Sequence, residues 1–182
     1  MSMTSIRPAS SEYTPYHAVY VEAVPDGDIL TILRANGKEL DALIASVPEE
    51  RGGYSYAEGK WSIREIVGHI IDGERVLGYR ALRAARGDTT PLPGYDAEAY
   101  IDPAGSDART LADLRAELRA VRESTSCFYA SLPGEAWDRV GVSGDRAISV
   151  RGLAYVTVGH AIHHMRALVE RYGVLAPATE RL

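Results

Sequence analysis

A chain of 182 residues is long enough for one well-buried domain and short for two. Its composition, 46% apolar and 25% charged residues, is ordinary for a globular protein. The net charge of −5 leaves no basic excess to neutralise phosphates, which argues against a nucleic-acid binder, and the single cysteine, Cys127, excludes an internal disulfide framework. Because no apolar run resembles a signal peptide or approaches the ~20 residues of a membrane span, we expect a soluble cytoplasmic protein with no membrane partner.

The first expected helix covers residues 28–47, after a polar N-terminal arm at residues 1–26. Its apolar residues recur at helical spacing, at Ile29, Leu33, Leu40 and Leu43. Gly37 lies inside this pattern and weakens it slightly, because glycine is a poor helix former. His17 lies in the arm, and we assign it no role.

The second expected helix has the best-marked start. Ser62 and Glu65 form an S-x-x-E capping box, and Trp61 and Ile66 have the spacing of a hydrophobic staple. The helix is predicted to run to about residue 86 and to stop at Gly87.

Two more helices are expected downstream. Residues 110–134 repeat leucines at helical spacing and end at a Pro-Gly pair. The last helix has Ser149 as its cap and Gly173 as its stop, and Ile148 and Leu153 have the spacing of a second staple.

The segments between the helices are expected to be loops. Residues 47–60, 87–106 and 133–148 are rich in Gly, Pro, Asp and Ser, and only "RVGVS" at 139–143 favours a short strand. Four amphipathic helices with long connections after the second and third predict an all-α fold, a four-helix bundle that forms one domain over residues 1–182. Sites in such bundles are built from side chains on facing helices.

Three of the five histidines lie in "GHAIHHMRAL", residues 159–168. At about 100° per residue, His160 and His164 share a stripe that points into the bundle, whereas His163 falls near solvent or at the edge. Histidines at i and i+4 can direct two nitrogens at one metal ion. Two buried, hydrogen-bonded histidines would explain this spacing equally well.

His69 favours the metal interpretation. It also faces inward, and Gly73, one turn later, leaves space beside its ring. Three inward imidazoles on two helices would each need a polar partner in an apolar bundle, and one divalent ion would satisfy all three. Three protein ligands leave one coordination position open, as in catalytic metal sites.

Two stretches, "KWSIREIVGHIIDGERVLGYRALRAARGDTTPLPGYD" and "VGHAIHHMRAL", resemble the DinB-like (damage-inducible) superfamily, which includes YfiT-type proteins assigned as metal-dependent hydrolases. The resemblance extends from about residue 27 to 173. The family signature is one histidine in the second helix and H-x-x-x-H in the last, which correspond to His69, His160 and His164. The W-S-x-x-E-x-x-x-H pattern and the G-D-x-x-P-L-P-G loop are the specific part of the match.

The resemblance implies a four-helix bundle in which these three histidines hold a divalent metal, with nickel and zinc as the leading candidates. It also implies frequent homodimers. Characterised relatives include enzymes that use low-molecular-weight bacterial thiols, while many members have no assigned reaction. The resemblance therefore indicates a site more strongly than a substrate.

Two polar residues near His69 have both a functional and a plainer interpretation. Asp72, one turn away, is a candidate catalytic proton acceptor or a partner for an imidazole, or else an exposed acid paired with Arg75 or Arg64. Arg80, on the His69 face, is a candidate to bind an anionic substrate or the carboxylate of a thiol cofactor, or else forms a salt bridge at the end of the bundle.

Other side chains are expected to be structural. Glu74 falls on a different face from the histidine and should pair with an arginine, Arg80 or Arg83 if it is buried. Tyr95 and Tyr100 could cover the pocket or simply pack. Cys127 is expected to be buried and not to act as a nucleophile.

The leading functional interpretation is a metal-dependent enzyme that acts on a small molecule, either a hydrolase or a thiol S-transferase. One alternative is a non-catalytic metal-binding protein of the stress response. Another is a purely structural bundle whose inward histidines are hydrogen-bonded without metal.

Overall fold

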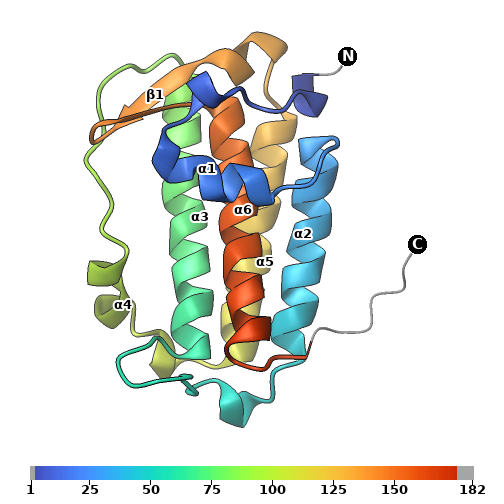
Figure 1. Cartoon of the computed structure of the whole chain (residues 1–182), viewed down its shortest axis with the longest axis vertical. Helices are drawn as coiled ribbons and strands as arrows, with labels where there is room; N and C mark the ends of the chain where they lie inside the picture. The colour runs from blue at the N-terminus through green and yellow to red at the C-terminus, as the bar shows by residue number, and fades with distance from the viewer. Residues whose placement is uncertain (1–2, 176–182) are drawn as a thin grey trace.

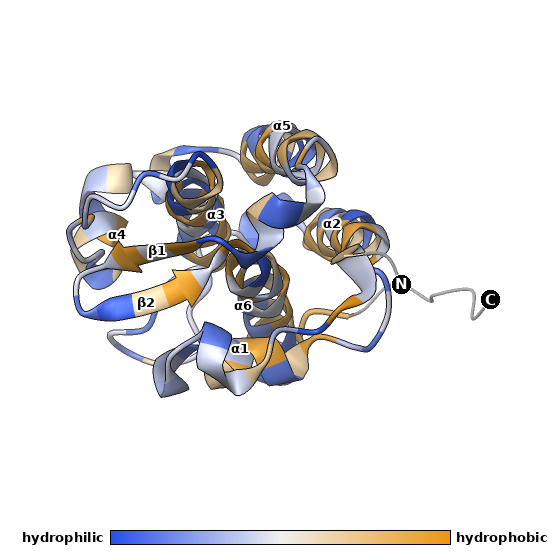
Figure 2. Ribbon diagram, turned by 90° about the horizontal axis from the view of Figure 1, so that it is seen from above, coloured by the Kyte–Doolittle hydropathy of each residue, from blue (hydrophilic) through white to orange (hydrophobic). Residues whose placement is uncertain are grey.

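Four long helices run along the main axis of the molecule in the computed structural model, which describes residues 3–175 (Figure 1). They are α2 (Ile29–Ala45), α3 (Ile63–Ala85), α5 (Leu111–Ala130) and α6 (Val150–Glu170). Both α2 and α3 pack against α5 and α6, so the four helices enclose a shared core, as the view from above shows (Figure 2). The all-α four-helix bundle predicted from the sequence is confirmed.

The long connection after α3 sets the order of the helices. The chain leaves the top of α3, descends along the outside of the bundle and enters α5 from below, so α3 and α5 are parallel neighbours (Figure 1). This connection holds the short helix α4 (Glu98–Ala104) within the segment expected to be a loop. Seven residues are too few to show a helical repeat, which is why the pattern missed it.

The predicted helix boundaries are confirmed at α3 and α6. The Ser62 hydroxyl accepts a hydrogen bond from the backbone N–H of Glu65, whose carboxylate accepts one from the Ser62 N–H at 2.7 Å. Ser149 caps α6 by accepting from the N–H of Gly152 at 2.9 Å. Gly87, after α3, has a φ of +75°, a conformation that glycine adopts without steric cost.

The N-terminal arm is more ordered than the sequence indicated. It contains α1 (Pro15–Ala23), which lies across α6 (Figure 1). A β-carbon at Gly159 would lie 2.0 Å from the carbonyl oxygen of Tyr20, so the glycine lets the two helix backbones approach closely. The helix buries His17 and Val21 against the bundle.

A β-hairpin occupies part of the last expected loop, and its first strand confirms the short strand predicted at residues 139–143. β1 (Val140–Ser143) and β2 (Arg146–Ser149) pair antiparallel, with Val140 opposite Ser149. The backbone of Leu92, in the α3–α4 connection, exchanges hydrogen bonds with the carbonyl of Val142 and the N–H of Gly144. The hairpin is thereby fixed to this connection.

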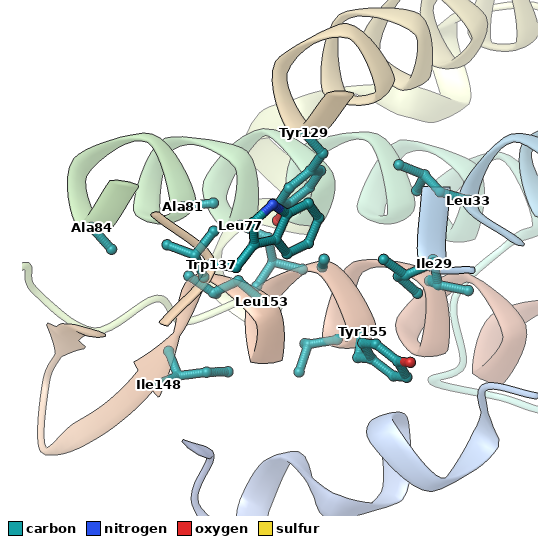
Figure 3. Close-up of a cluster of buried hydrophobic side chains, with 14 of the residues drawn as sticks. Ile29, Leu33, Leu77, Ala81, Ala84, Tyr129, Trp137, Ile148, Leu153 and Tyr155 are labelled. Atoms are coloured by element: carbon teal, nitrogen blue, oxygen red, sulfur yellow. The ribbon is translucent and has the colours of Figure 1, made fainter. Parts of the chain in front are cut away.

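The core consists of two clusters of buried apolar side chains. Figure 3 shows one of them, in which the indole of Trp137 stacks on the ring of Tyr129 with centroids 5.8 Å apart. The other lies among α2, α3, α5 and the last turns of α6. Along α6 the first cluster ends at Val158 and the second begins at Ala161, so His160 lies at the border between them.

Short 3-10 helices complete the described chain, at Met3–Ser5, Ser10–Glu12, Glu49–Arg51, Ser106–Ala108 and Gly134–Asp138. Within residues 3–175, none of the helices has the length and apolar character needed to cross a bilayer.

Candidate metal centre and its cavity

Three imidazoles from two helices converge in the bundle. The Nε2 atom of His160 on α6 lies 2.9 Å from Nε2 of His69 on α3 and 3.1 Å from Nε2 of His164, one turn further along α6. One ligand atom from each ring can be chosen so that all three lie within 4.8 Å of one another. His163 is exposed and is outside this cluster, on the separate face that its helical phase predicts.

Hydrogen bonds among the rings cannot satisfy all three. A neutral imidazole nitrogen either donates one hydrogen or accepts through one lone pair, so Nε2 of His160 can pair fully with only one of its two neighbours. The Nδ1 atom of His69 is buried without a hydrogen-bond partner among residues 3–175. A purely hydrogen-bonded cluster therefore leaves buried polar atoms unpaired, which is unfavourable.

The same arrangement fits a divalent ion. Nitrogens that each lie 2.0–2.1 Å from a tetrahedral zinc are about 3.3 Å apart, close to the two distances at His160. Burial, with a smaller contribution from charge on neighbouring histidines, lowers the pKa of His69 to about 4, that of His160 to about 3 and that of His164 to about 2. The rings are consequently neutral at pH 7, the form in which imidazole binds metals.

Aromatic side chains surround the three histidines. The Trp61 indole packs on the His69 ring at 4.8 Å and lies nearly parallel to the His164 ring at 6.5 Å. From α1, Tyr20 presents its ring to both His160 and His163, at 5.7 and 5.8 Å. The sequence indicates Trp61 as half of a staple and as the first residue of the family pattern that ends at His69. It gives no signal for Tyr20, which lies on a helix that was not predicted in the arm.

A cavity of about 600 Å³ opens beside the cluster. All three histidines line it, together with side chains from α1, α3, the α3–α4 connection and the hairpin. Its other lining residues include His17, Tyr20, Trp61, Arg80, Tyr95, Glu98 and Arg146. Burial lowers the pKa of His17 to about 4, and the positive charges of Arg146 and Arg80 add to the effect.

The structure brings only part of the predicted site to this cavity. Arg80 lines it, as does Tyr95, against whose ring Tyr100 packs edge-on at 4.9 Å. Asp72 is not among the lining residues; its carboxylate lies 3.8 Å from the guanidinium of Arg75, the plainer role weighed for it. Burial raises the pKa of the Asp72 carboxyl.

Glu74 pairs with an arginine that the sequence did not suggest. Its carboxylate accepts three hydrogen bonds of 2.8–3.0 Å from Arg122 of α5, and not from Arg80 or Arg83. Arg122 also donates to the backbone carbonyl of Leu33 at 3.1 Å and to the side chain of Asn36 at 2.9 Å, both on α2. This buried pair links three helices of the bundle.

The expectation that Cys127 is buried is wrong. Its side chain is exposed on α5, where the thiol donates a 3.6 Å hydrogen bond to the carboxylate of Glu123. The buried face of this helix passes through Leu118, Ser126 and Tyr129 instead, so the cysteine points outward. It is absent from the cavity wall, consistent with its having no catalytic role.

Comparison with known proteins identifies the family. The model of the DinB superfamily matches residues 32–168, most of the chain. The chain belongs to the DinB superfamily. Comparison with curated proteins gives no match.

Solved structures share the fold. YfiT from Bacillus subtilis, described as "a probable metal-dependent hydrolase with an unusual four-helix bundle topology", superposes with a TM-score of 0.71 at 19% identity, covering 81% of this chain and 87% of that one. A DinB-like protein from B. subtilis, YjoA, gives 0.59 at 20% identity, covering 86% of this chain and 100% of that one.

A mycothiol-dependent maleylpyruvate isomerase also matches, with a TM-score of 0.66 at 17% identity, covering 81% of this DinB-superfamily chain. The match spans only 60% of the isomerase. At such identities the likeness establishes the fold and not the reaction.

Proposed function

We propose that this protein is a metal-dependent enzyme in which His69, His160 and His164 hold one divalent transition metal beside a small-molecule cavity. The observation that carries the proposal is the convergence of three neutral imidazoles on the wall of a 600 Å³ cavity, one buried and two half-buried, which cannot satisfy one another. Nickel and zinc are the leading candidates, because neutral imidazole suits both.

A bound ion would supply Lewis acidity, by polarising a substrate oxygen or by favouring the deprotonated form of a water or thiol. The chain's own residues shape the surroundings. Trp61 packs against the ring of His69 and Tyr20 against that of His160, so part of the surface of both rings is shielded from water. His69 joins α3 to the site, while the other two rings are fixed one turn apart on α6.

A cavity-facing carboxylate is available as a proton acceptor. Glu98 lines the cavity together with His164 and accepts a 3.3 Å hydrogen bond from the indole N–H of Trp61. We propose Glu98 for this role in place of Asp72, because the Asp72 carboxylate lies toward Arg75 and is absent from the cavity wall. Glu98→Gln should lower turnover more than Asp72→Asn.

Two reaction classes remain for the proposed enzyme. Hydrolysis is supported by the likeness to YfiT, and thiol transfer by the likeness to the mycothiol-dependent isomerase. Because Cys127 lies outside the cavity, a reacting thiol would have to come from a low-molecular-weight cofactor.

The test is elemental analysis of protein purified without a polyhistidine tag, followed by a screen of esters and of thiol-dependent reactions with and without chelator. We expect about one metal ion per chain and turnover that stops on chelation and returns with nickel or zinc. Metal binding with no chelator-sensitive turnover would favour the non-catalytic alternative, and a metal-free protein would favour the purely structural one.

A further inference from the structure

Arg80 is a half-buried cation without a partner in the cavity wall. Its guanidinium makes no hydrogen bond and no ion pair with any other part of the described chain. Among residues 3–175, three carboxylates line the same cavity, and none is within ion-pair distance of Arg80. Asp96 accepts from the backbone N–H groups after it, Glu98 accepts from Trp61, and Asp145 lies 3.8 Å from Arg146. A guanidinium withdrawn from water without a counter-charge is costly, unless a ligand provides one.

A second cation faces the same space from the hairpin. The guanidinium of Arg146 lies 3.7 Å from the centre of the Tyr16 ring, which holds it by a cation–π contact. Its nearest acid, Asp145, is 3.8 Å away and almost fully exposed, so it neutralises Arg146 only weakly. Arg80 and Arg146 line the same cavity, and burial and then the charge of Arg146 lower the pKa of Arg80.

An unpaired hydroxyl adds a neutral donor. Tyr95 lines this cavity, and its phenolic oxygen is buried with no hydrogen-bond partner among residues 3–175. Burial raises its pKa to about 12, so the hydroxyl keeps its proton at neutral pH and can donate. Unpaired buried polar groups are rare in folded proteins, and a ligand is one explanation for them.

We propose that Arg80, Arg146 and the Tyr95 hydroxyl form an oxyanion subsite, which binds a carboxylate or phosphate of the substrate while the reacting group lies at the three histidines. The assignment of the reacting group rests on the proposed function, whereas the subsite can be tested without metal.

The spacing of residues along α3 indicates the distance between the two functional groups of the substrate. Gly73, which adjoins the His160 ring, and Arg80 are seven positions apart on α3, about 10 Å along the axis. Because side chains on a helix slant toward its N-terminus, the guanidinium is carried back toward the histidines. The anionic group and the reacting group should therefore be about 5–10 Å apart, as in a small acid with a short chain between its two functional groups.

The experiment is calorimetric titration of metal-free protein at low ionic strength with inorganic phosphate and, separately, with glutarate. The variants are Arg80→Gln, Arg146→Gln and Arg80→Lys, and the matched control is Arg86→Gln, which removes the same charge from an exposed site on the end of the same helix, outside the cavity. Circular dichroism checks the fold of each protein.

Wild-type protein should bind at least one probe saturably, and Arg80→Gln should weaken binding at least about tenfold, the loss expected for a charge-assisted hydrogen bond. Arg146→Gln should weaken binding of the same probe about threefold, because the Arg146 guanidinium is more exposed. If Arg80→Gln does not fold, the affinity of Arg146→Gln tests the subsite instead. Arg80→Lys should retain part of the affinity and Arg86→Gln nearly all of it. Tighter binding of glutarate assigns a carboxylate substrate, and tighter binding of phosphate assigns a phosphate one.

Two results would overturn the subsite. One is an absence of saturable binding of both probes, and the other is an equal loss in Arg80→Gln and Arg86→Gln, which would mark a general charge effect. Because the protein carries no metal in this titration, failure of the subsite is separate from failure of the metal site, which elemental analysis reports.

Discussion

The His160 imidazole of α6 packs directly against Gly73 of α3. A β-carbon at position 73 would lie 2.9 Å from Cε1 and 3.4 Å from Nδ1 of that ring. The space that the sequence placed beside His69 is thus filled by His160, and the glycine allows rings from two helices to reach one point.

Replacing Gly73 with Ala should displace the His160 ring and lower metal affinity by at least about tenfold, because a shift of a few tenths of an ångström spoils the convergence of ligands. Metal content and competition with a chelator dye measure the effect. Gly78→Ala is the control: nothing lies within 4 Å of the added methyl, so it should keep full affinity and stabilise the helix by up to about 1 kcal/mol. Equal affinity in the two variants would contradict the packing role of Gly73.

Single alanine variants of His69, His160 and His164 should each lose most of the bound metal, because each removes one of the three proposed ligands. His163→Ala is the matched control, since this ring is on the same helix but exposed and outside the cluster. Elemental analysis of folded protein gives the comparison. Full occupancy in His69→Ala would mean that the pair on α6 is completed by another residue.

The parts of the fold that repeat along one helix could be predicted from the sequence. Helical phase separates His163 from His160 and His164, and the capping box at Ser62 fixes where α3 begins, because both depend only on neighbours within a few residues. The three-histidine cluster follows from such local information together with the family signature.

Contacts between distant segments could not be predicted in this way. The partner of Glu74 is Arg122, 48 positions later, and the room for it is made by Gly37, where a β-carbon would lie 2.8 Å from Cγ of Arg122. The sequence alone indicates this glycine only as a poor helix former. Likewise, nothing local indicates that Tyr20 would cover the histidines, since only the docking of α1 at Gly159 brings it there.

The buried pair gives a stability prediction. Glu74→Gln should leave the Arg122 guanidinium buried without a full counter-charge and lower the free energy of unfolding by about 3–5 kcal/mol. Asp113→Asn, which breaks the exposed ion pair with Arg109, should cost less than about 1 kcal/mol. Urea unfolding of both variants makes the comparison, and a similar small loss in the two would show that the pair contributes little.

Homodimer formation stays a prediction that the family resemblance implies. Sedimentation equilibrium at micromolar concentration should then give a species of twice the 19.8 kDa chain mass. A single species at the mass of one chain across that concentration range would contradict it.

The pH dependence of stability tests whether Arg80 and Arg146 act on His17, which lines the same cavity. Burial and the charges of Arg146 and Arg80 lower the pKa of His17 from 6.5 to about 4, and Thr14 is its hydrogen-bond partner at Nδ1, 3.1 Å away. As the pH falls from 6.5 to 4, the unfolded chain takes up a proton on this ring while the folded chain does not. His17 therefore destabilises the fold progressively over that window, and above pH 6.5 its effect disappears.

His17→Asn removes this titration and retains an acceptor near the position of Nδ1. The free energy of unfolding of metal-free wild type, relative to this variant, should fall by about 1 kcal/mol between pH 6.5 and pH 4, a value reduced from the full shift because solvent in the cavity screens part of the charge. Urea unfolding at intermediate pH values measures it, and the other histidines cancel because both proteins contain them. In an Arg146→Gln background the difference should shrink, since one of the two cations that repel the charged ring is gone. A difference that stays constant with pH would mean that His17 titrates normally and that the arginines do not act on it.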